Sequence, residues 1–288
     1  MIRGPRGERY YKLALHLHTT NSDGALTPLE VARKYKAEGY DAIAFTDHWF
    51  YNPEGEIEGV KIISGCEYNL GVSDTVEGVL HIVGLGMKCD PCCEKSDSKE
   101  EVIRKIRAAG GVAVLAHPGW SLNPPSEYLE VEGYSATEIY NAVSDAGESL
   151  RPYSDYFADL VANGGKYPAL LATDDAHYYD GSDDCRGFVM IKAEGLTREA
   201  ITQAIENSEL FASQGPEVFV YREGNSFRIE TSPASVIGIV SSLSWSKGRV
   251  LRGEGLTHFE YTAKDERWLR VEVRDAEGRR AYSRFFVL

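Results

Sequence analysis

The 288-residue sequence lacks any run of about 20 consecutive apolar residues, and this absence excludes a transmembrane helix. No apolar stretch follows the basic N-terminal residues, so we expect no signal peptide. Cysteine is scarce, with five residues, and Cys89 and Cys92 form a Cys-x-x-Cys with no second pair to complete a structural zinc site. The odd number of cysteines favours reduced thiols, and we therefore expect a cytoplasmic protein.

Positive charge is also limited. The chain has 31 lysines and arginines against 44 aspartates and glutamates, which gives a net charge of −13. The acidic excess lies in residues 1–214, because residues 215–288 are slightly basic. An acidic surface repels nucleic-acid phosphates and anionic lipids, so we expect neither duplex nucleic acid nor a membrane as a partner. A small phosphorylated substrate is still compatible with this charge, because metal ions held by carboxylates invert the local field.

Apolar runs alternate with amphipathic segments from residue 10 to about 213. One helix is expected to begin at Thr27, with Pro28 in its first turn and Glu30 completing a capping box, and to end at Gly39. The predicted strands are residues 11–16, 41–46, 62–65, 79–85, 112–116, 137–140, 169–172 and 188–191. This alternation predicts parallel βα units, and seven or eight strands in about 200 residues predict a closed or nearly closed barrel.

The pattern changes after residue 214. Apolar and polar residues alternate over 269–274, a turn is expected at 275–278, and residues 282–288 return as a strand, which together predict a hairpin. Residues 227–231 and 236–241 are also predicted strands. We therefore expect a barrel domain at 1–214, followed by a small antiparallel β-sandwich at 215–288.

Histidine is rare, and its positions are the most informative feature of the sequence. Six of the seven histidines lie in the alternating part. His16, His18, His48 and His117 stand at or just beyond the end of an apolar run, and His81 lies inside one. The C-terminal strand ends of a parallel barrel meet at one mouth, where active sites form, so we expect these side chains to lie close together.

Carboxylates accompany these histidines. Imidazole and carboxylate ligands together suit zinc, manganese or iron, and nine candidates allow two or three divalent ions. The nine candidate ligands are His16, His18, Asp23, His48, Glu67, His81, His117, Asp175 and His177. Taken singly, each also fits a hydrogen-bonded loop histidine or a solvated carboxylate, and it is their coincidence that favours a metal site.

Six short motifs, taken in order, resemble those of the PHP (polymerase and histidinol phosphatase) family of metal-dependent phosphoesterases. The motifs are His16-Leu17-His18 with Ser22-Asp23-Gly24, Thr46-Asp47-His48, Gly65-Cys66-Glu67, His81, Ala116-His117-Pro118 and Asp175-Ala176-His177. The resemblance spans residues 11 to about 210. It implies an α/β fold, with a distorted (β/α)7 TIM-like barrel, and a cluster of up to three metal ions.

The resemblance also implies how the ligands divide. The first ion would take His16, His18, Glu67 and Asp175, the second Glu67, His81 and His117, and the third Asp23, His48 and His177. Glu67 would then bridge the first two ions. Some family members have a histidine in place of Asp23, and the aspartate is typical of a branch that acts on small phosphorylated molecules or nucleotides. Asp174 is an alternative to Asp175, which we prefer because the family spacing is Asp-x-His.

These residues predict a metal-dependent hydrolase that cleaves a phosphate ester of a small molecule or nucleotide by attack of a metal-bridging hydroxide. The predicted catalytic residues are Glu67, Asp175 and His177. Asp47 is expected to accept a hydrogen bond from a ligand imidazole. Arg186 and Asn141 are expected to bind the substrate, and Arg186 would clamp a phosphate oxygen.

Other interpretations stay open. An amidohydrolase-type metallohydrolase also begins with His-x-His, but it usually carries a bridging lysine, and no lysine stands at a convincing strand end here. A non-catalytic protein that binds through the C-terminal sandwich is a second alternative. Aromatic residues after the metal motifs, such as Trp120 and Tyr178, would either stack on a nucleoside base or pack over the loops. The sequence indicates neither the oligomeric state nor a monoester or diester substrate.

Overall fold

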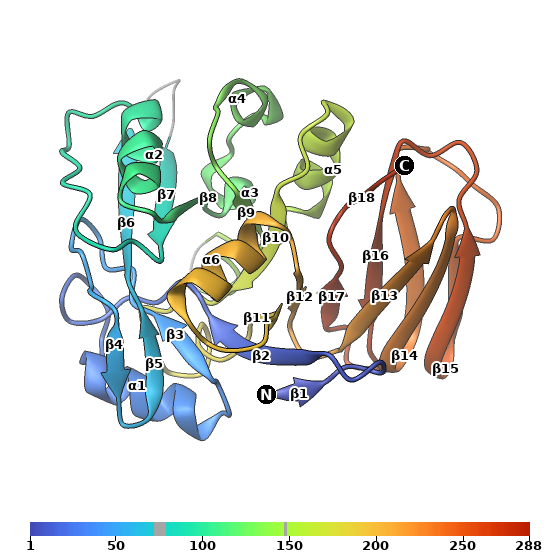
Figure 1. The fold of residues 1–288 in the computed structure, drawn as a ribbon, viewed down its shortest axis with the longest axis horizontal. Helices are drawn as coiled ribbons and strands as arrows, with labels where there is room; N and C mark the ends of the chain where they lie inside the picture. Colours follow the sequence, from blue (N-terminus) through green and yellow to red (C-terminus); the bar gives the residue numbers. More distant parts are fainter. Residues whose placement is uncertain (72–78, 147–148) are drawn as a thin grey trace.

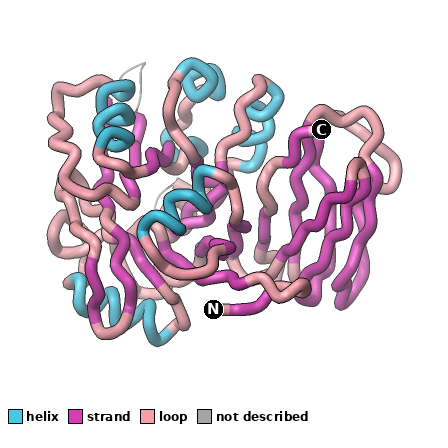
Figure 2. Tube along the Cα trace, in the orientation of Figure 1, coloured by secondary structure: helices cyan, strands magenta, loops and turns pink. Residues whose placement is uncertain are grey.

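The computed structural model describes residues 1–71, 79–146 and 149–288. Figure 1 shows the C-terminal strands on one side of the molecule and the first two hundred residues on the other. Helices are short compared with the extent of the strands and loops (Figure 2). The described helices are α1 (Pro28–Ala37), α2 (Lys99–Ala108), α3 (Pro118–Ser121), α4 (Pro125–Glu130), α5 (Asp155–Asn163) and α6 (Arg198–Glu206).

The described strands form two sheets. The larger has the spatial order β13-β14-β16-β17-β12-β11-β2-β3-β5-β4, with β1, β15 and β18 paired to β2, β14 and β16. Its strands are β1 (Ile2–Arg3), β2 (Arg9–Ala14), β3 (Ala42–Ala44), β4 (Gly55–Ile57), β5 (Val60–Ile63), β11 (Phe188–Lys192), β12 (Leu210–Ser213), β13 (Val218–Glu223), β14 (Ser226–Ser241), β15 (Val250–Thr262), β16 (Trp268–Arg274), β17 (Arg280–Tyr282) and β18 (Phe286–Val287). The smaller sheet has the order β10-β9-β8-β7-β6. Its strands are β6 (Gly65–Gly71), β7 (Val79–Leu85), β8 (Val112–Leu115), β9 (Ala136–Asn141) and β10 (Ala169–Thr173).

The mixed α/β fold is as expected, but the described residues form no closed barrel. The pairs β2/β3, β3/β5, β8/β9 and β9/β10 are parallel, whereas β6/β7, β7/β8 and β2/β11 are antiparallel. The segment between β6 and β7 is too short for the crossover of a dozen or more residues that a parallel pair requires. The predicted distorted (β/α)7 TIM-like barrel is therefore not confirmed.

The two sheets nevertheless enclose one core. Leu13 and Ala44 of the larger sheet pack with Val83, Val114 and other buried residues of the smaller one. One face of α6 covers this core with Ile201, Ala204 and Ile205. Single β-bridges between Leu17 and Ala176, and between His48 and Glu67, connect the sheets just beyond the strand ends. The ends of strands from both sheets are thereby brought to the same place.

The C-terminal strands are antiparallel, as predicted, but they continue the larger sheet. Strand β17 pairs with β12 through Ala212 and Tyr282, so hydrogen bonding runs across residue 214 without a break. The β16–β17 hairpin forms as expected. The predicted strands 227–231 and 236–241 are parts of one long strand, β14, with irregular register between Glu230 and Val236. The division at residue 214 and a separate sandwich remain predictions.

Helix α1 shows how the local sequence fixes an element. The Thr27 side chain accepts from the Glu30 backbone N–H, and the Glu30 carboxylate accepts from the Thr27 N–H, which completes the predicted capping box. Such a cap contributes about 1 kcal/mol of helix stability. Val31 and Tyr35 are buried and pack in a cluster with Ile43 of β3. The helix therefore supports the strand that leads to His48.

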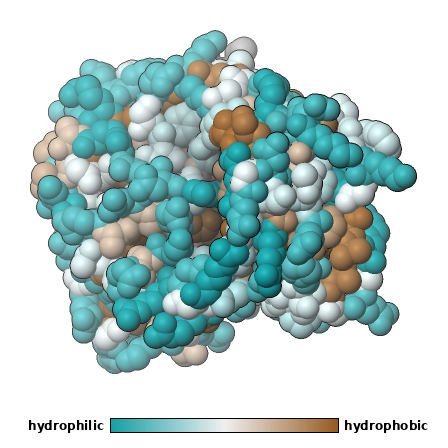
Figure 3. Space-filling model, turned by 45° about the vertical axis from the view of Figure 1, so that its right-hand side comes forward, coloured by the Kyte–Doolittle hydropathy of each residue, from teal (hydrophilic) through white to brown (hydrophobic). Residues whose placement is uncertain are grey.

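No described helix combines the length and apolar character that are needed to cross a bilayer. The face drawn in Figure 3 is mainly hydrophilic, with apolar residues gathered in a few small patches.

Candidate metal centre

The predicted ligands come from the ends of strands in both sheets. His16 and His18 follow β2, His48 follows β3, and His117 follows β8. Asp175 and His177 follow β10, while Glu67 and His81 lie within β6 and β7. The backbone holds these ends in register, because the His18 N–H donates to the Ala176 carbonyl (3.0 Å) and the Asp175 N–H donates to the His16 carbonyl (2.9 Å). All nine predicted ligands gather in one cluster.

The first group contains four buried side chains: His16, His18, Glu67 and Asp175. The Nε2 atoms of His16 and His18 lie 3.2 and 3.0 Å from Glu67 Oε2, and both lie 3.1 Å from Asp175 Oδ1. Ligands that surround one ion at about 2.1 Å lie roughly 3 Å or slightly more from each other. These atoms therefore have the mutual spacing of a common coordination shell.

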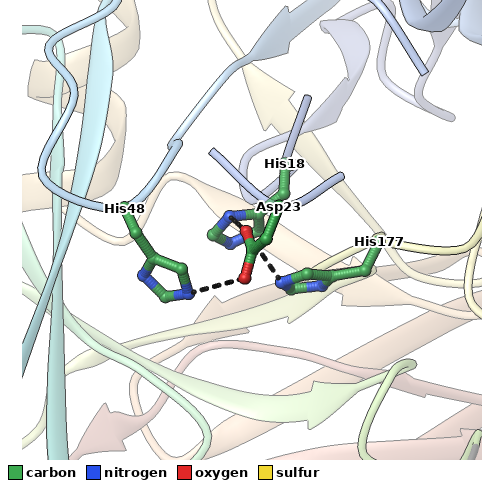
Figure 4. Close-up of side chains that lie close together, drawn as sticks. All are labelled: His18, Asp23, His48 and His177. Atoms are coloured by element: carbon green, nitrogen blue, oxygen red, sulfur yellow. Dashed lines mark ion pairs between the residues drawn. The ribbon is translucent and has the colours of Figure 1, made fainter. Parts of the chain in front are cut away.

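The second and third groups flank the first. In the second, Glu67 Oε1 lies 2.8 Å from His81 Nδ1 and 3.4 Å from His117 Nε2. Glu67 thus directs one oxygen to each of two groups, which is the arrangement of a bridging carboxylate. The third group surrounds Asp23 (Figure 4), whose carboxylate lies 3.4 Å from His18, 3.7 Å from His48 and 3.6 Å from His177.

Two features distinguish the third group, and the first of them differs from the expected division of ligands. His18 belongs to two groups, because its Nε2 faces Glu67 and Asp175 while its Nδ1 faces Asp23. The carboxylate of Asp23 is also the most exposed of the acidic groups in the cluster, at 55% of its side chain. The carboxylate of the third group is therefore more exposed to solvent than those of the other two.

Orphaned polar atoms test whether these residues fit metal ions. Among the described residues, His48 Nδ1, Glu67 Oε2 and Asp175 Oδ1 are buried and make no hydrogen bond. A buried polar atom without a partner costs about 1–3 kcal/mol. Three such atoms in one cluster, each close to nitrogen or oxygen atoms of ligand type, fit positions that a cation would satisfy. The cluster can therefore hold metal ions.

The charges of the cluster reinforce one another. Burial alone would lower the pKa of His16 and His18, but nearby carboxylates outweigh it and raise both pKa values well above the ordinary range. Burial alone would raise the pKa of Glu67 and Asp175, but the surrounding imidazoles hold both well below the ordinary range. Both buried carboxylates are therefore ionised at neutral pH and available as ligands.

Two residues of the cluster have unusual backbone conformations. His117 has φ 28° and Asp175 has φ 52°, in the left-handed region that L-residues rarely adopt. Such conformations cost about 1–3 kcal/mol and persist where the surroundings enforce them, often at functional sites. Here the sharp turns aim both side chains back toward Glu67.

A cavity of about 410 Å³ opens onto the cluster. Its walls include Glu67, Asp175 and four of the histidines on one side, with Trp120 and Tyr178 among the remaining lining residues. This volume is within the range of small-molecule sites.

Comparison with known proteins places the chain in a family. The PHP domain model matches residues 14–147. An uncharacterized protein of Methanocaldococcus jannaschii is 31% identical over 126 residues, which cover 37% of this chain and 67% of that protein. The chain belongs to the PHP domain family. The resemblance drawn from the motifs is thus confirmed.

Two further relatives have assigned activities. A 5'-3' exoribonuclease of Haemophilus influenzae is 33% identical over 105 residues, or 34% of this chain and 37% of that protein. A 3',5'-nucleoside bisphosphate phosphatase of Chromobacterium violaceum is 37% identical over 76 residues, or 25% of this chain and 27% of that protein. The chain thus spans well under half the length of each of these two enzymes.

One solved structure resembles the whole chain. It is a two-domain protein of Bacteroides vulgatus that contains a predicted PHP-like metal-dependent phosphoesterase, with a TM-score of 0.57 and 14% identity. The match covers 98% of this chain and 95% of that one. It shows that the fold extends through the C-terminal strands.

The prediction that excludes duplex nucleic acid as a partner is wrong. Structures similar to this PHP chain include endonuclease Q in complex with a 27-mer duplex that has an abasic lesion at the active site, with a TM-score of 0.47, 16% identity, and coverage of 69% of this chain and 57% of that one. The prediction failed because net charge is an average over the whole surface, whereas a phosphate responds to the local field.

Three further predicted site residues have different partners from those expected. Asp47 is buried and accepts from the Thr19 N–H (2.7 Å) and the Ser22 hydroxyl (2.9 Å), so it holds the loop after His18 instead of an imidazole. The Asn141 amide donates to Asp175 Oδ2 (3.1 Å), so it positions a predicted ligand. Arg186 is exposed and donates to the Ser182 carbonyl (2.8 Å), away from the cavity lining.

The two neighbouring aspartates are separated by the fold. Asp175 points into the cluster of predicted ligands, whereas Asp174 accepts hydrogen bonds from the Tyr35 hydroxyl (2.6 Å) and from the N–H groups of residues 185–187. Burial raises the pKa of Asp174 to about 7. Asp174 therefore shapes the loop after His177, and the preference for Asp175 as the ligand agrees with this placement.

Sequence reasoning missed Glu138. Its carboxylate is buried in β9 and accepts from His16 Nδ1 (2.7 Å), from the His117 backbone N–H (3.0 Å) and from the Asn141 amide (2.8 Å). It thereby fixes the orientation of His16 and leaves His16 Nε2 free for a ligand role. A signal was present, because Glu138 lies inside a predicted strand, and a charged residue that is buried is rare unless it is paired. Asp183, which accepts from the His177 and Tyr178 N–H groups (2.6 and 2.8 Å), was also missed.

Proposed function

We propose that this PHP protein is a metal-dependent phosphoesterase that hydrolyses a phosphate ester of a small molecule or nucleotide. One observation carries the proposal. Of the three groups of ligand atoms, the first shares Glu67 with the second and His18 with the third, and all three lie beside a cavity of small-molecule size. Such adjacency suits a substrate whose charged oxygens must contact more than one cation.

Each group has its own proposed ligands. His16, His18, Glu67 and Asp175 would hold one divalent ion, Glu67, His81 and His117 a second, and His18, Asp23, His48 and His177 a third. Zinc, manganese and iron all suit this mixture of imidazole and carboxylate. When bound, such ions neutralise phosphoryl oxygens and lower the pKa of water.

Hydrogen bonds to carbonyl and carboxylate oxygens set the proton positions on two histidines. His16 Nδ1 faces Glu138 at 2.7 Å, and His177 Nδ1 faces the Asp175 carbonyl at 2.6 Å. Since a carbonyl oxygen only accepts, His177 carries a proton on Nδ1, and its Nε2 lies 3.6 Å from Asp23 Oδ1. His177 is also partly exposed, so we propose that it contacts both metal and substrate.

The proposed reaction is a direct displacement. The oxygen of water bonds to phosphorus, the ester P–O bond breaks, and the bonding electron pair leaves with the alcohol oxygen. The proton lost by water ends on that oxygen, so the products are the alcohol and phosphate. Glu67 and Asp175 are held ionised and fixed by their neighbours, so they need no reorganisation during the displacement.

The structure gives no support to the amidohydrolase alternative. No lysine is among the residues that line the cavity in the described part of the chain. No specific observation favours a binding role for the C-terminal strands over catalysis either.

Metal content and phosphate release test the proposal together. We expect two or three zinc, manganese or iron ions per chain by mass spectrometry after gentle purification, and metal-dependent phosphate release from a panel of nucleotides and sugar phosphates. In single turnover in oxygen-18 water, the label should enter the released phosphate. A chain that takes up neither Mn²⁺ nor Zn²⁺ would refute the proposal, and an unlabelled phosphate would refute direct displacement.

A further inference from the structure

The part of the cavity lining that is not made of proposed metal ligands is mainly aromatic and apolar. It contains Trp120, Val143, Ala146 and Tyr178, with two serines as its other polar side chains. Both serine hydroxyls are already used, because Ser144 donates to the Asn141 side-chain oxygen (2.7 Å) and Ser149 donates to the Ser144 carbonyl (2.7 Å). This wall therefore offers planar and apolar surface to the part of a substrate that extends beyond its phosphoryl group.

The two aromatic residues lie close to predicted ligands. Trp120 lies in α3, and its ring centroid is 5.0 Å from that of His117 and 5.6 Å from that of His81. Helix α3 is held by the Gly119 N–H, which donates to the Ser154 hydroxyl (3.0 Å). Tyr178 follows His177, is 56% exposed, and donates its backbone N–H to the Asp183 carboxylate (2.8 Å). Both residues therefore line the cavity beside the cluster.

The described lining of the cavity offers few positively charged groups. No lysine or arginine is among its lining residues in the described part of the chain. Residues 72–78 and 147–148, which lie outside the description, also contain neither residue type in the sequence. Arg151 and Arg186 are exposed and absent from the lining. A second phosphate, away from the metal ions, would therefore lose water without gaining a partner, which is costly.

We propose that the cavity selects a phosphate ester that has a single phosphoryl group and a planar aromatic substituent, with the substituent against Trp120 and Tyr178. This inference rests on the proposed function, because the metal groups must hold the phosphoryl group. It separates this chain from the Chromobacterium violaceum relative, whose substrates carry two phosphates. Stacking on an aromatic side chain changes affinity by about tenfold or more per base.

Non-hydrolysable phosphonates test the inference by binding alone. The metal-loaded protein is titrated by calorimetry with phenylphosphonate and with methylphosphonate, which differ only in the ring. We expect phenylphosphonate to bind about tenfold more tightly. Trp120→Ala should remove most of that preference and leave methylphosphonate affinity unchanged, while Trp120→Phe should keep it. Trp245→Ala is the matched control, because Trp245 is 76% exposed in the C-terminal part.

Each outcome has a definite meaning. Benzene-1,4-diphosphonate has two equivalent phosphonate groups, so it should bind no more tightly than phenylphosphonate apart from that statistical gain. A much tighter complex would overturn the single-phosphoryl inference. Equal affinity for phenyl- and methylphosphonate would overturn the aromatic inference while leaving the proposed function intact. If Trp120→Ala weakens both phosphonates equally, the ring only supports His117, and the inference is wrong. Failure of the metal-loaded protein to bind either phosphonate would refute the proposed function itself.

Discussion

Glu138 gives the sharpest test of how the metal cluster is built. Its carboxylate receives three hydrogen bonds, from His16 Nδ1, the His117 N–H and the Asn141 amide. In a Glu138→Gln variant, one oxygen and one NH₂ group must serve these three donors. If the amide oxygen keeps the hydrogen bonds from His117 and Asn141, the NH₂ group faces His16 Nδ1 and forces the proton of that imidazole onto Nε2. The proposed ligand atom is then blocked.

The opposite amide orientation is no better for the protein. It keeps the hydrogen bond from His16 but places the NH₂ group against the N–H donors of His117 and Asn141. Each buried donor left unsatisfied costs about 1–3 kcal/mol. Loss of an outer hydrogen-bond partner typically weakens metal binding by about 10–100-fold. We therefore expect Glu138→Gln to lose about 1.4–2.7 kcal/mol of metal-binding free energy.

The assay is competition for Zn²⁺ or Mn²⁺ with a chelator of known affinity, with the His16 tautomer followed by ¹⁵N NMR. Glu266→Gln is a matched control, because Glu266 is also buried and accepts from the Tyr261 hydroxyl and the Lys264 N–H (2.6 Å), but it lies in the C-terminal strands. If Glu138→Gln folds and binds metal as tightly as the parent protein, Glu138 does not position His16. An equal loss in Glu266→Gln would show a general effect of destabilisation.

Three further predictions concern stability. Removal of metal by a chelator should lower the melting temperature by about 5–10 °C when the parent is loaded at about 100 times its dissociation constant, and an unchanged melting temperature would argue against bound metal. Burial raises the pKa of Glu217, so its contribution to stability is present at low pH and is lost as pH rises through that pKa; Glu217→Gln should therefore raise the melting temperature at pH 7 but not near pH 4. Arg270→Met should cost about 3–5 kcal/mol in denaturant unfolding, because it strands the Asp159 carboxylate that Arg270 contacts at 2.8 and 2.9 Å; a loss below 1 kcal/mol would refute that reasoning.

The sequence predicted the members of the candidate site better than the shape of the fold. His16, His48 and His117 could be grouped because each follows an apolar run, and the ends of neighbouring strands meet whether or not a barrel closes. The strand directions could not be predicted in the same way, because an apolar run has the same pattern in a parallel and an antiparallel pair. Strand β15 escaped notice because its exposed residues lack a clear alternation.

The partners of individual polar groups were harder to predict than their positions. Asp47 and Asn141 lie beside the cluster, as expected, but Asp47 holds Thr19 and Ser22, and Asn141 holds Asp175. Sequence places a residue on an element to within one or two positions, whereas a hydrogen bond depends on tenths of an ångström. Such partners therefore follow only from coordinates.

The charge of the chain is best understood at the scale of the site. Two ionised carboxylates, Glu67 and Asp175, are buried at the base of the cavity, and the described lining contains no lysine or arginine. Without metal, a dianionic phosphonate would meet these carboxylates with only imidazoles to compensate them. In the proposed site, metal ions would therefore supply the positive charge that lysine or arginine supplies in other phosphate sites. Phosphonate binding should consequently disappear on metal removal, whereas a site with its own arginine would keep part of its affinity.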